Sequence, residues 1–272
     1  MIIPQNLPPG QKPLVLVTHN ESTFSANDGK RRRWMENLNG KQPLRPKGRG
    51  KGLMVSNFLM SGGRLAQAVP DIVLDAELAA QLLPHRYATE YFMYGKDKYW
   101  QGDDMVNHTT KVAIPIFNAI FPGCQAVFAF DNASNHCSYA ADALRVKNIN
   151  LHPGGKQGVL REAFMYGKGL PQSMSFAKDY YNRELAGKLK GIKRVLKERR
   201  LWPERGLMLE CLVIHNRPGC NPEGGCCACR VLKAERDFWD QKGHLQEEVE
   251  VLDHHILFYS KFHCELNFIE RY

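Results

Sequence analysis

The stretch from Ala126 to His136, with the sequence AVFAFDNASNH, places the strongest constraint on the fold of this chain. Its first five residues are apolar, which is too short for an ordinary helix and typical of a strand buried on both faces. Asp131 follows directly, where the strand would leave the core. Because ligands of open α/β sheets gather outside the carboxyl ends of strands, Asp131 is a candidate site residue. The alternative is an Asx-turn that Asp131 forms with Asn132 and Asn135.

Length and composition indicate an ordinary globular protein. The chain has 272 residues, of which 43% are hydrophobic and 24% charged, so it can bury one sizeable core or two smaller ones. Prolines interrupt the N-terminal segment MIIPQNLPPGQKP, and no apolar stretch reaches membrane-spanning length. We therefore expect an intracellular protein with no membrane partner. In a reducing compartment the eight cysteines would be thiols or metal ligands rather than disulfides.

Further strands are predicted from short runs rich in Leu, Val, Ile and Phe. These runs are Pro13–Thr18, Gly52–Met60 and Ile256–Tyr259. The first run is interpreted as a second buried strand. It ends in a polar group that contains His19, Asn20 and Glu21, which makes a second candidate site at a strand end.

The segment from Gly102 to Phe121 predicts a helix, because apolar residues recur in it at helical spacing. Pro115 would kink or divide this helix. Asp103 and Asp104 precede the apolar pattern. This position favours an N-cap and first-turn charges over the alternative, a pair of metal ligands.

Two basic clusters lie on either side of Trp34 in a segment whose prolines and glycines prevent regular structure. Together with the net charge of +9, they suit a phosphate backbone, and DNA binding that weakens steeply with salt is expected. A solvated hairpin loop is the alternative. The candidate contacts are Arg31, Arg32, Arg33, Arg45, Lys47, Arg49 and Lys51.

A second basic region is predicted to be a helix with an apolar seam formed by Leu185, Leu189, Ile192 and Leu196. Its opposite side is strongly positive and is either a solvated face or a nucleic-acid contact. The candidate contacts on it are Lys193, Arg194 and Lys197.

Cysteines gather between positions 211 and 229, around the turn NPEGG. Thiolates and imidazole at short spacing can form a tetrahedral zinc site, for which Cys220, Cys226 and Cys229 are candidates. A fourth ligand would come from Cys211, Cys227 or His215. The spacing lacks two regular CxxC pairs, so free thiols packed in a small core are the alternative.

Three blocks of the sequence, HNESTF, FAFDNASNH and FHCELNFIE, resemble the motif blocks of DDE-type transposases of the mariner and pogo kind, in the form found among fungal mobile elements. The resemblance covers nearly the whole chain. It implies an α/β protein with an RNase H-like mixed sheet of about five strands flanked by helices. It also implies an acidic triad holding Mg²⁺ or Mn²⁺ for DNA cleavage and strand transfer, a DNA partner, a nuclear location and a homo-oligomer.

By this resemblance the catalytic positions are Asn20, Asp131 and Glu270, with Asp131 and Glu270 as metal ligands. Residues 1–150 would be the first part of the core, 151–240 a helical, cysteine-containing and basic insertion, and 241–272 the last core strand and the start of the final helix. The insertion would explain the long separation of the last two acids, 270 − 131 = 139 residues.

Two departures from the family pattern predict a defective enzyme. Asn20 stands where the family has Asp, and a neutral amide oxygen is a weaker ligand for a hard cation than a carboxylate. Glu21 would face the other side of a continuing strand and is not expected to substitute. The family's N-terminal helix-turn-helix is also missing and the chain ends soon after Glu270, so Asn20→Asp alone is expected to restore little.

The sequence therefore predicts a transposon-derived DDE endonuclease domain that is defective as written. The alternative is a nucleic-acid-binding or interaction protein that keeps the fold and has lost the chemistry. A zinc-stabilised adaptor unrelated to DNA is a third hypothesis, which rests on the cysteines only.

Overall fold

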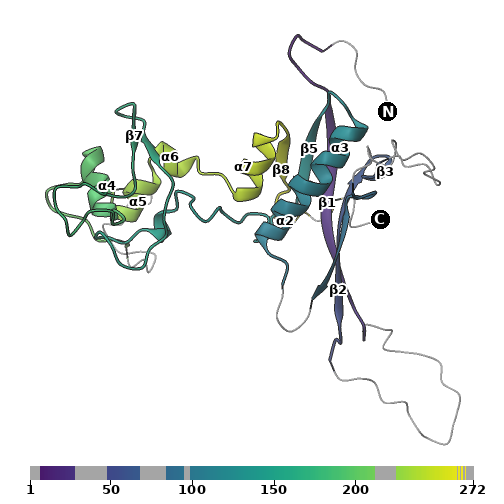
Figure 1. Ribbon diagram of the computed structural model, residues 1–272, viewed down its shortest axis with the longest axis horizontal. Helices are drawn as coiled ribbons and strands as arrows, with labels where there is room; N and C mark the ends of the chain where they lie inside the picture. Colours follow the sequence, from purple (N-terminus) through teal and green to yellow (C-terminus); the bar gives the residue numbers. More distant parts are fainter. Residues whose placement is uncertain are drawn as a thin grey trace, which may run out of the picture. The chain divides into compact units, whose positions relative to one another are not determined.

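The computed structural model describes residues 7–27, 48–67, 84–94, 99–211, 225–261, 263, 265 and 267. The chain divides into two compact units (Figure 1). The first comprises Met1–Ser138 and Gly243–Tyr272, and the second comprises Tyr139–Lys242. Within the described residues, no helix has the length and apolar character needed to cross a membrane.

The first unit is built on a mixed sheet with the strand order β3-β2-β1-β5-β8, in which β4 also pairs with β2. Strand β1 is parallel to β5, β5 is parallel to β8, and β2 is antiparallel to β1. This arrangement is consistent with an RNase H-like fold. The strands are β1 (Leu14–Ser25), β2 (Gly52–Met60), β3 (Gly63–Arg64), β4 (Thr89–Tyr94), β5 (Gln125–Phe130) and β8 (His255–Phe258).

All strands predicted from apolar runs are present, but the prediction of burial on both faces was wrong for β1. Val15 and Val17 are buried, whereas Leu14 and Leu16 between them are exposed. Successive side chains of a strand point to opposite faces, so only one face of β1 packs against the core here. Strand β5 is more fully enclosed, with Ala129 buried as well as its inward-facing neighbours.

The helix predicted over residues 102–121 is divided into three parts. These are α2 (Gly102–His108), the π-helical turn η1 (Thr109–Ala113) and α3 (Ile114–Ile120). Pro115 follows the π-helical turn directly, and the backbone stays right-handed helical on both sides of this turn. The segment is therefore interrupted by a change of helix type next to Pro115, as a proline inside a helix favours.

Asp103 and Asp104 lie in the first turn of α2, as predicted. The Asp104 carboxylate accepts a hydrogen bond of 3.0 Å from the backbone N–H of Gln101, the N-cap residue. Acidic side chains here also complement the positive end of the helix dipole. The two aspartates therefore start a helix.

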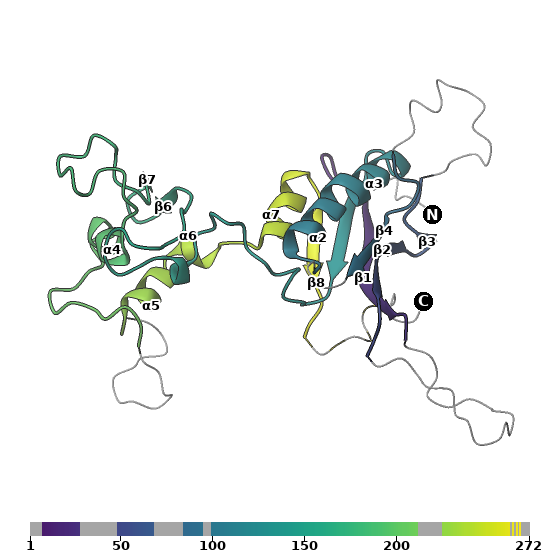
Figure 2. The same cartoon turned by 60° about the horizontal axis from the view of Figure 1, so that its bottom comes forward.

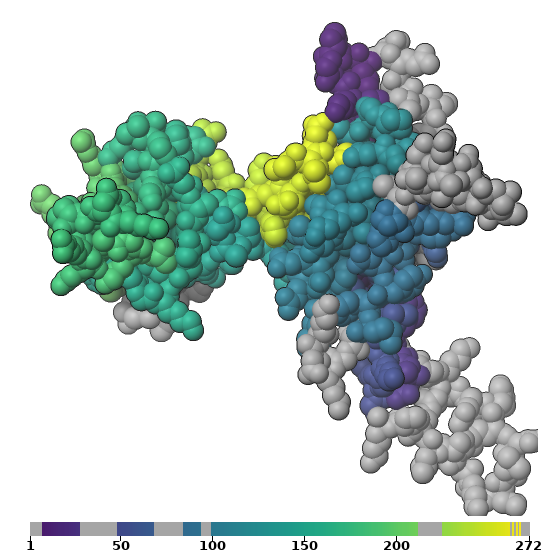
Figure 3. Space-filling model, in the orientation of Figure 1, coloured from purple at the N-terminus to yellow at the C-terminus, as the bar shows by residue number. Residues whose placement is uncertain are grey.

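Helices α2, α3 and α7 (His244–Val251) pack on one face of the sheet (Figure 2), with Gly243 as the N-cap of α7. In the space-filling view, atoms of the segment from α2 to α3 lie over the sheet (Figure 3). Inward-facing strand residues meet this helical layer in a single core. Its largest buried members are Phe58, Leu65, Met105, Ile116, Phe117, Phe128, Phe130 and Leu245.

The second unit has a separate core, formed by short elements. They are η2 (Val146–Asn148), the hairpin of β6 (Ala163–Met165) and β7 (Leu170–Gln172), α4 (Ile192–Arg199), α5 (Ala228–Lys233) and α6 (Arg236–Trp239). The buried core includes Leu144, Ile149, Leu160, Met174, Ile192, Val195, Leu196, Leu232 and Phe238. It can therefore be stabilised without contributions from the sheet.

The basic helix of this unit is shorter than predicted. Leu185 and Leu189 precede α4, and Leu189 instead forms a bridge with Ser175. Gly191 lies against the backbone of His152, so closely that an added Cβ would stand 2.4 Å from the carbonyl carbon. The chain needs an extended glycine at this close approach, and the helix begins only after it.

Arg199, the last residue of α4, is buried although it belongs to the basic region. Its guanidinium donates hydrogen bonds to Asp237 at 2.6 and 2.9 Å and to Glu235 at 2.9 Å. A further bond reaches the Gln172 side chain at 2.8 Å. Arg199 therefore links α4, α6 and the β-hairpin of the second unit.

We expect Arg199→Ala to lower the free energy of unfolding of the second unit by about 3 to 5 kcal/mol, because it leaves the buried Asp237 carboxylate without a counter-charge. Arg236→Ala is the matched control. It removes an exposed pair with Asp240 and a contact of the guanidinium with the Tyr166 ring at 4.7 Å, and should change stability by no more than about 1 kcal/mol. Urea unfolding of both variants measures the difference, and equal effects would contradict this role of Arg199.

Candidate functional site

The candidate site lies where the parallel pairing of β1 with β5 stops. Strand β1 itself continues through Asn20 and Glu21 to Ser25, so the strand end predicted at Thr18 was wrong. The last paired residues are Thr18 and Ala129. The same register, continued by two residues along each strand, would pair Asn20 with Asp131. Asp131 directly follows β5, and the Asn20 side chain accepts a hydrogen bond of 2.9 Å from the backbone N–H of Glu21.

His136 connects β1 and the end of β5 through a pair of carboxylates. Its Nδ1 lies 2.5 Å from Asp131 Oδ1, and its Nε2 lies 3.0 Å from Glu21 Oε1. Asn135 Nδ2 also donates to Glu21 Oε1, at 3.2 Å. The imidazole is fully buried, whereas the Asp131 side chain is 47% exposed. Asp131 is thus the member of this group that solvent or a ligand can reach.

These contacts make His136 a cation at neutral pH. Burial disfavours the charged imidazole, but the hydrogen bonds to Asp131 and Glu21 outweigh burial and raise the pKa of His136 to about 9. The bond from His136 in turn lowers the pKa of Asp131, against the effect of partial burial. An imidazolium ion therefore holds two carboxylates at the edge of the sheet.

Both sequence interpretations of Asp131 are present in the structure. Its Oδ1 accepts a hydrogen bond of 3.1 Å from the backbone N–H of Ala133, which is the bond of an Asx-turn. Asn132 Nδ2 donates to the carbonyl of Tyr259, just after β8. The turn thus fixes the Asp131 carboxylate and ties the end of β5 to the end of β8.

A row of buried polar side chains lies behind the site. His19 Nε2 and His108 Nδ1 each lie 2.8 Å from Ser56 Oγ. Burial, together with His136 and His108, lowers the pKa of His19, and burial lowers the pKa of His108 to about 3. Both rings are therefore neutral. Sequence reasoning did not single out Ser56 or His108. The signal available in the sequence was alternation along β1, which places His19 and Glu21 on the same inward face as Val15 and Val17.

The last sequence block is described only at some positions. Glu270 lies outside the described residues, as do His215 and Cys220. Asn267 is buried and donates to the carbonyl of His19 at 3.1 Å, which anchors this block against β1. Glu265 is exposed and lies 2.6 Å from His263.

Of the predicted DNA contacts in the basic loop, Arg49 and Lys51 are described and both are exposed. Their carbonyls accept hydrogen bonds from the N–H groups of Asn27 and Ala26, at 3.0 and 2.8 Å. The remaining contacts, Arg31, Arg32, Arg33, Arg45 and Lys47, lie outside the described residues.

On α4 the three predicted contacts differ in their surroundings. Lys197 is exposed. Arg194 Nε donates to Glu198 at 2.9 Å, and Lys193 Nζ lies 5.6 Å from the centre of the Trp202 ring. The positive charge available on this helix is therefore smaller than the sequence indicated.

Three cysteines of the second unit come together. Cys211 Sγ and Cys226 Sγ are 3.1 Å apart, and the group that they form with Cys227 lies within 4.8 Å. Cys229, a predicted ligand, lies instead 3.9 Å from Glu210 Oε1. Burial and this carboxylate raise the pKa of Cys229 to about 12, so its thiol stays protonated.

The described residues at this edge do not by themselves form a two-metal centre. They offer one accessible carboxylate, Asp131, and the neutral amide of Asn20. A second group of potential ligands, His19, Glu21 and His136, contains a single carboxylate. Glu21 is turned toward His136, and the His136 cation lies against Asp131. Hard divalent cations need several negative oxygen ligands, particularly when two share a site.

Comparison with known proteins gives little further information. No family model and no curated protein matches the chain. A chain in the crystal structure of the mariner Mos1 paired end complex with Mg is similar over 45% of this chain and 30% of its own length, with 15% sequence identity and a TM-score of 0.27. A likeness at this level establishes neither family nor function.

The charge on His136 predicts a pH-dependent stability. Because the folded pKa of about 9 lies above the usual 6.5, this stabilisation is complete below pH 6.5 and is lost as the pH rises through 9. The loss should amount to about 3 kcal/mol. His136→Gln should remove it, whereas His255→Gln, an exposed change on β8, should keep it. Urea unfolding between these pH values is the measurement, and parallel curves for the unmodified protein and His136→Gln would contradict the assignment.

Proposed function

We propose that this chain is a DDE-type transposase domain of the mariner and pogo kind that keeps the fold and is defective in DNA strand cleavage. The observation that supports it is the mixed sheet, in which the parallel pairing of β1 with β5 stops two residues before Asn20 and Asp131. The three motif blocks resemble those of this family. In the proposed ancestor, the first two acids of the triad occupied these positions.

The charges at the site account for the proposed defect. Cleavage of a phosphodiester by two cations needs ligands that neutralise both, and Asn20 contributes a dipole where the family has a negative charge. The imidazolium of His136 lies at 2.5 Å from the remaining carboxylate and repels a cation there. Mg²⁺ or Mn²⁺, when bound, would polarise the phosphodiester, but these residues would hold it weakly.

DNA is the proposed partner, and the nucleus the proposed location. The net charge of +9 and the exposed Arg49 and Lys51 suit a polyanion. The second candidate function is a nucleic-acid-binding protein that has lost the chemistry altogether, and the substitution at Asn20 favours it. Both functions predict DNA binding. They differ in the effect of Asn20→Asp, which should restore metal binding in a defective transposase domain and should not in a protein that has lost the chemistry altogether.

The cysteine cluster supports a separate proposal, a zinc ion held by Cys211, Cys226 and Cys227. Three sulfur ligands within 4.8 Å are a donor set that suits zinc. Backbone bonds from Ala228 to Met208 and from Cys229 to Leu209 already join the two segments that carry them. The ion would hold the start of α5 against the segment that carries Cys211. Such a link would add stability to a unit whose helices and strands are short.

For the strand-end site, we expect the unmodified chain not to nick supercoiled plasmid in Mg²⁺ or Mn²⁺. Asn20→Asp should raise the affinity for Mn²⁺ by about tenfold or more, since a second carboxylate joins Asp131. Calorimetric titration measures this gain, and Asn20→Asp combined with Asp131→Asn is the control that should lose it. Metal-dependent nicking by the unmodified chain, abolished by Asp131→Ala, would show a working nuclease and overturn the proposed defect.

For the cysteine cluster, we expect protein purified without chelator to carry about one equivalent of zinc. Cys226→Ser should remove most of it, whereas Cys229→Ser should not, because Cys229 lies apart from the group. Elemental analysis of the three proteins is the measurement. Absence of zinc from the unmodified protein would refute the site, and equal loss in both variants would refute this choice of ligands.

A further inference from the structure

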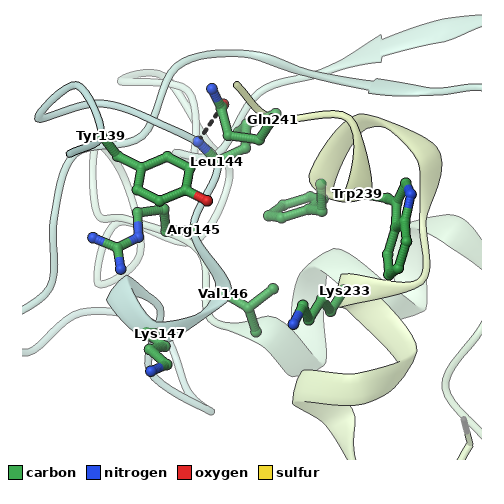
Figure 4. A pocket seen from close by; sticks show the side chains of 9 residues that line it. Tyr139, Leu144, Arg145, Val146, Lys147, Lys233, Trp239 and Gln241 are labelled. Carbon is green, nitrogen blue, oxygen red and sulfur yellow. Dashed lines mark hydrogen bonds between the residues drawn. The ribbon is translucent and has the colours of Figure 1, made fainter. Parts of the chain in front are cut away.

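The second unit contains a cavity of about 250 Å³ that none of the functions above uses. Figure 4 shows its lining side chains, which come from the segment that enters the unit and from α5 and α6. They are Tyr139, Leu144, Arg145, Val146, Lys147, Lys233, Phe238, Trp239 and Gln241. Leu144 and Phe238 belong to the buried core and form its apolar base.

The charges around this cavity have one sign. Arg145, Lys147 and Lys233 line it, and its lining contains no acidic residue. The Arg145 guanidinium carbon lies 4.5 Å from the centre of the Tyr139 ring, a distance at which a cation and a ring attract each other. This contact holds a positive charge at the cavity. An anionic group is the ligand that such a lining would attract.

Two aromatic rings at the cavity are accessible. Tyr139 is 41% exposed and Trp239 is 71% exposed, although both are large side chains that folding normally buries. The side chain of Gln241 accepts a hydrogen bond of 2.8 Å from the Leu144 N–H, which joins the two segments that carry these rings (Figure 4). The two segments that carry the rings are therefore joined by a hydrogen bond.

We propose that this cavity binds a nucleotide of single-stranded DNA, with the base against the aromatic rings and the phosphate near the cations. Aromatic rings that hold unpaired bases, next to basic residues that follow the backbone, are the usual means of binding single strands. The volume lies near the lower limit of ligand pockets, about 300 Å³, and so suits one base. Duplex DNA keeps its bases stacked and cannot offer one without flipping it.

The inference deepens the proposed function, since it takes DNA as the partner, but it concerns another unit and another form of DNA.

Binding of a fluorescent oligothymidine of about twenty nucleotides, followed by anisotropy, tests it. Trp239→Ala should weaken this binding about tenfold. Tyr181→Ala, which removes an 86% exposed ring of the same unit away from the cavity, is the matched control and should change it less than about twofold. Duplex affinity should hardly change in either variant.

A charge variant gives a second, independent measurement. Lys147→Ala with Lys233→Ala should reduce the slope of log affinity against log salt by about 1.4 for the single strand, whereas Lys156→Ala with Lys178→Ala, at exposed positions of the same unit outside the cavity lining, should not. No binding of oligothymidine by the unmodified chain would overturn the inference. So would equal losses in Trp239→Ala and Tyr181→Ala. Duplex binding that persists in either case would leave the proposed function standing.

Discussion

The parallel pairing of β1 with β5 is the constraint on which the first unit depends. It aligns Val15 and Val17 with Ala126 and Phe128 on one face, and this face supplies the surface on which α2, α3 and α7 pack. The same pairing brings the end of β5 to the middle of β1, where the candidate site lies. The core and the candidate site are therefore consequences of a single strand register.

At this site the main interaction is electrostatic. His136 is buried between Asp131 and Glu21, and its charge replaces part of what a metal ion would supply by neutralising two carboxylates. The two carboxylates are thus balanced by a charge of the chain itself, in keeping with the proposal that the chain keeps the fold and has lost the chemistry. Neutral His19 and His108 behind it add no charge to this balance.

The second unit obtains its stability in another way. Its helices and strands are short, and the buried Arg199 joins three of them through charged hydrogen bonds. The cysteine cluster and the basic, aromatic cavity lie in this unit too. The zinc site and the nucleotide site proposed for this unit are thus independent of the site at the sheet edge. A test of one of these sites does not decide the others.

The sequence by itself predicted β2, β5, β8, the first half of β1, the start of α2 and an interruption of the helix near Pro115, because apolar runs, first-turn aspartates and a proline act through local physics. It did not predict β3, β4, β6 or β7. It singled out Asp131 as a strand-end residue, whereas Asn20, singled out in the same way, lies inside β1. It could not assign His136 to Glu21, Cys211 to Cys226, or Arg199 to Asp237, since these partners are far apart in the chain and meet only when strands and helices pack. Tertiary structure also decided which basic residues stay available, because a charge run looks the same in sequence whether its members are exposed, paired or buried.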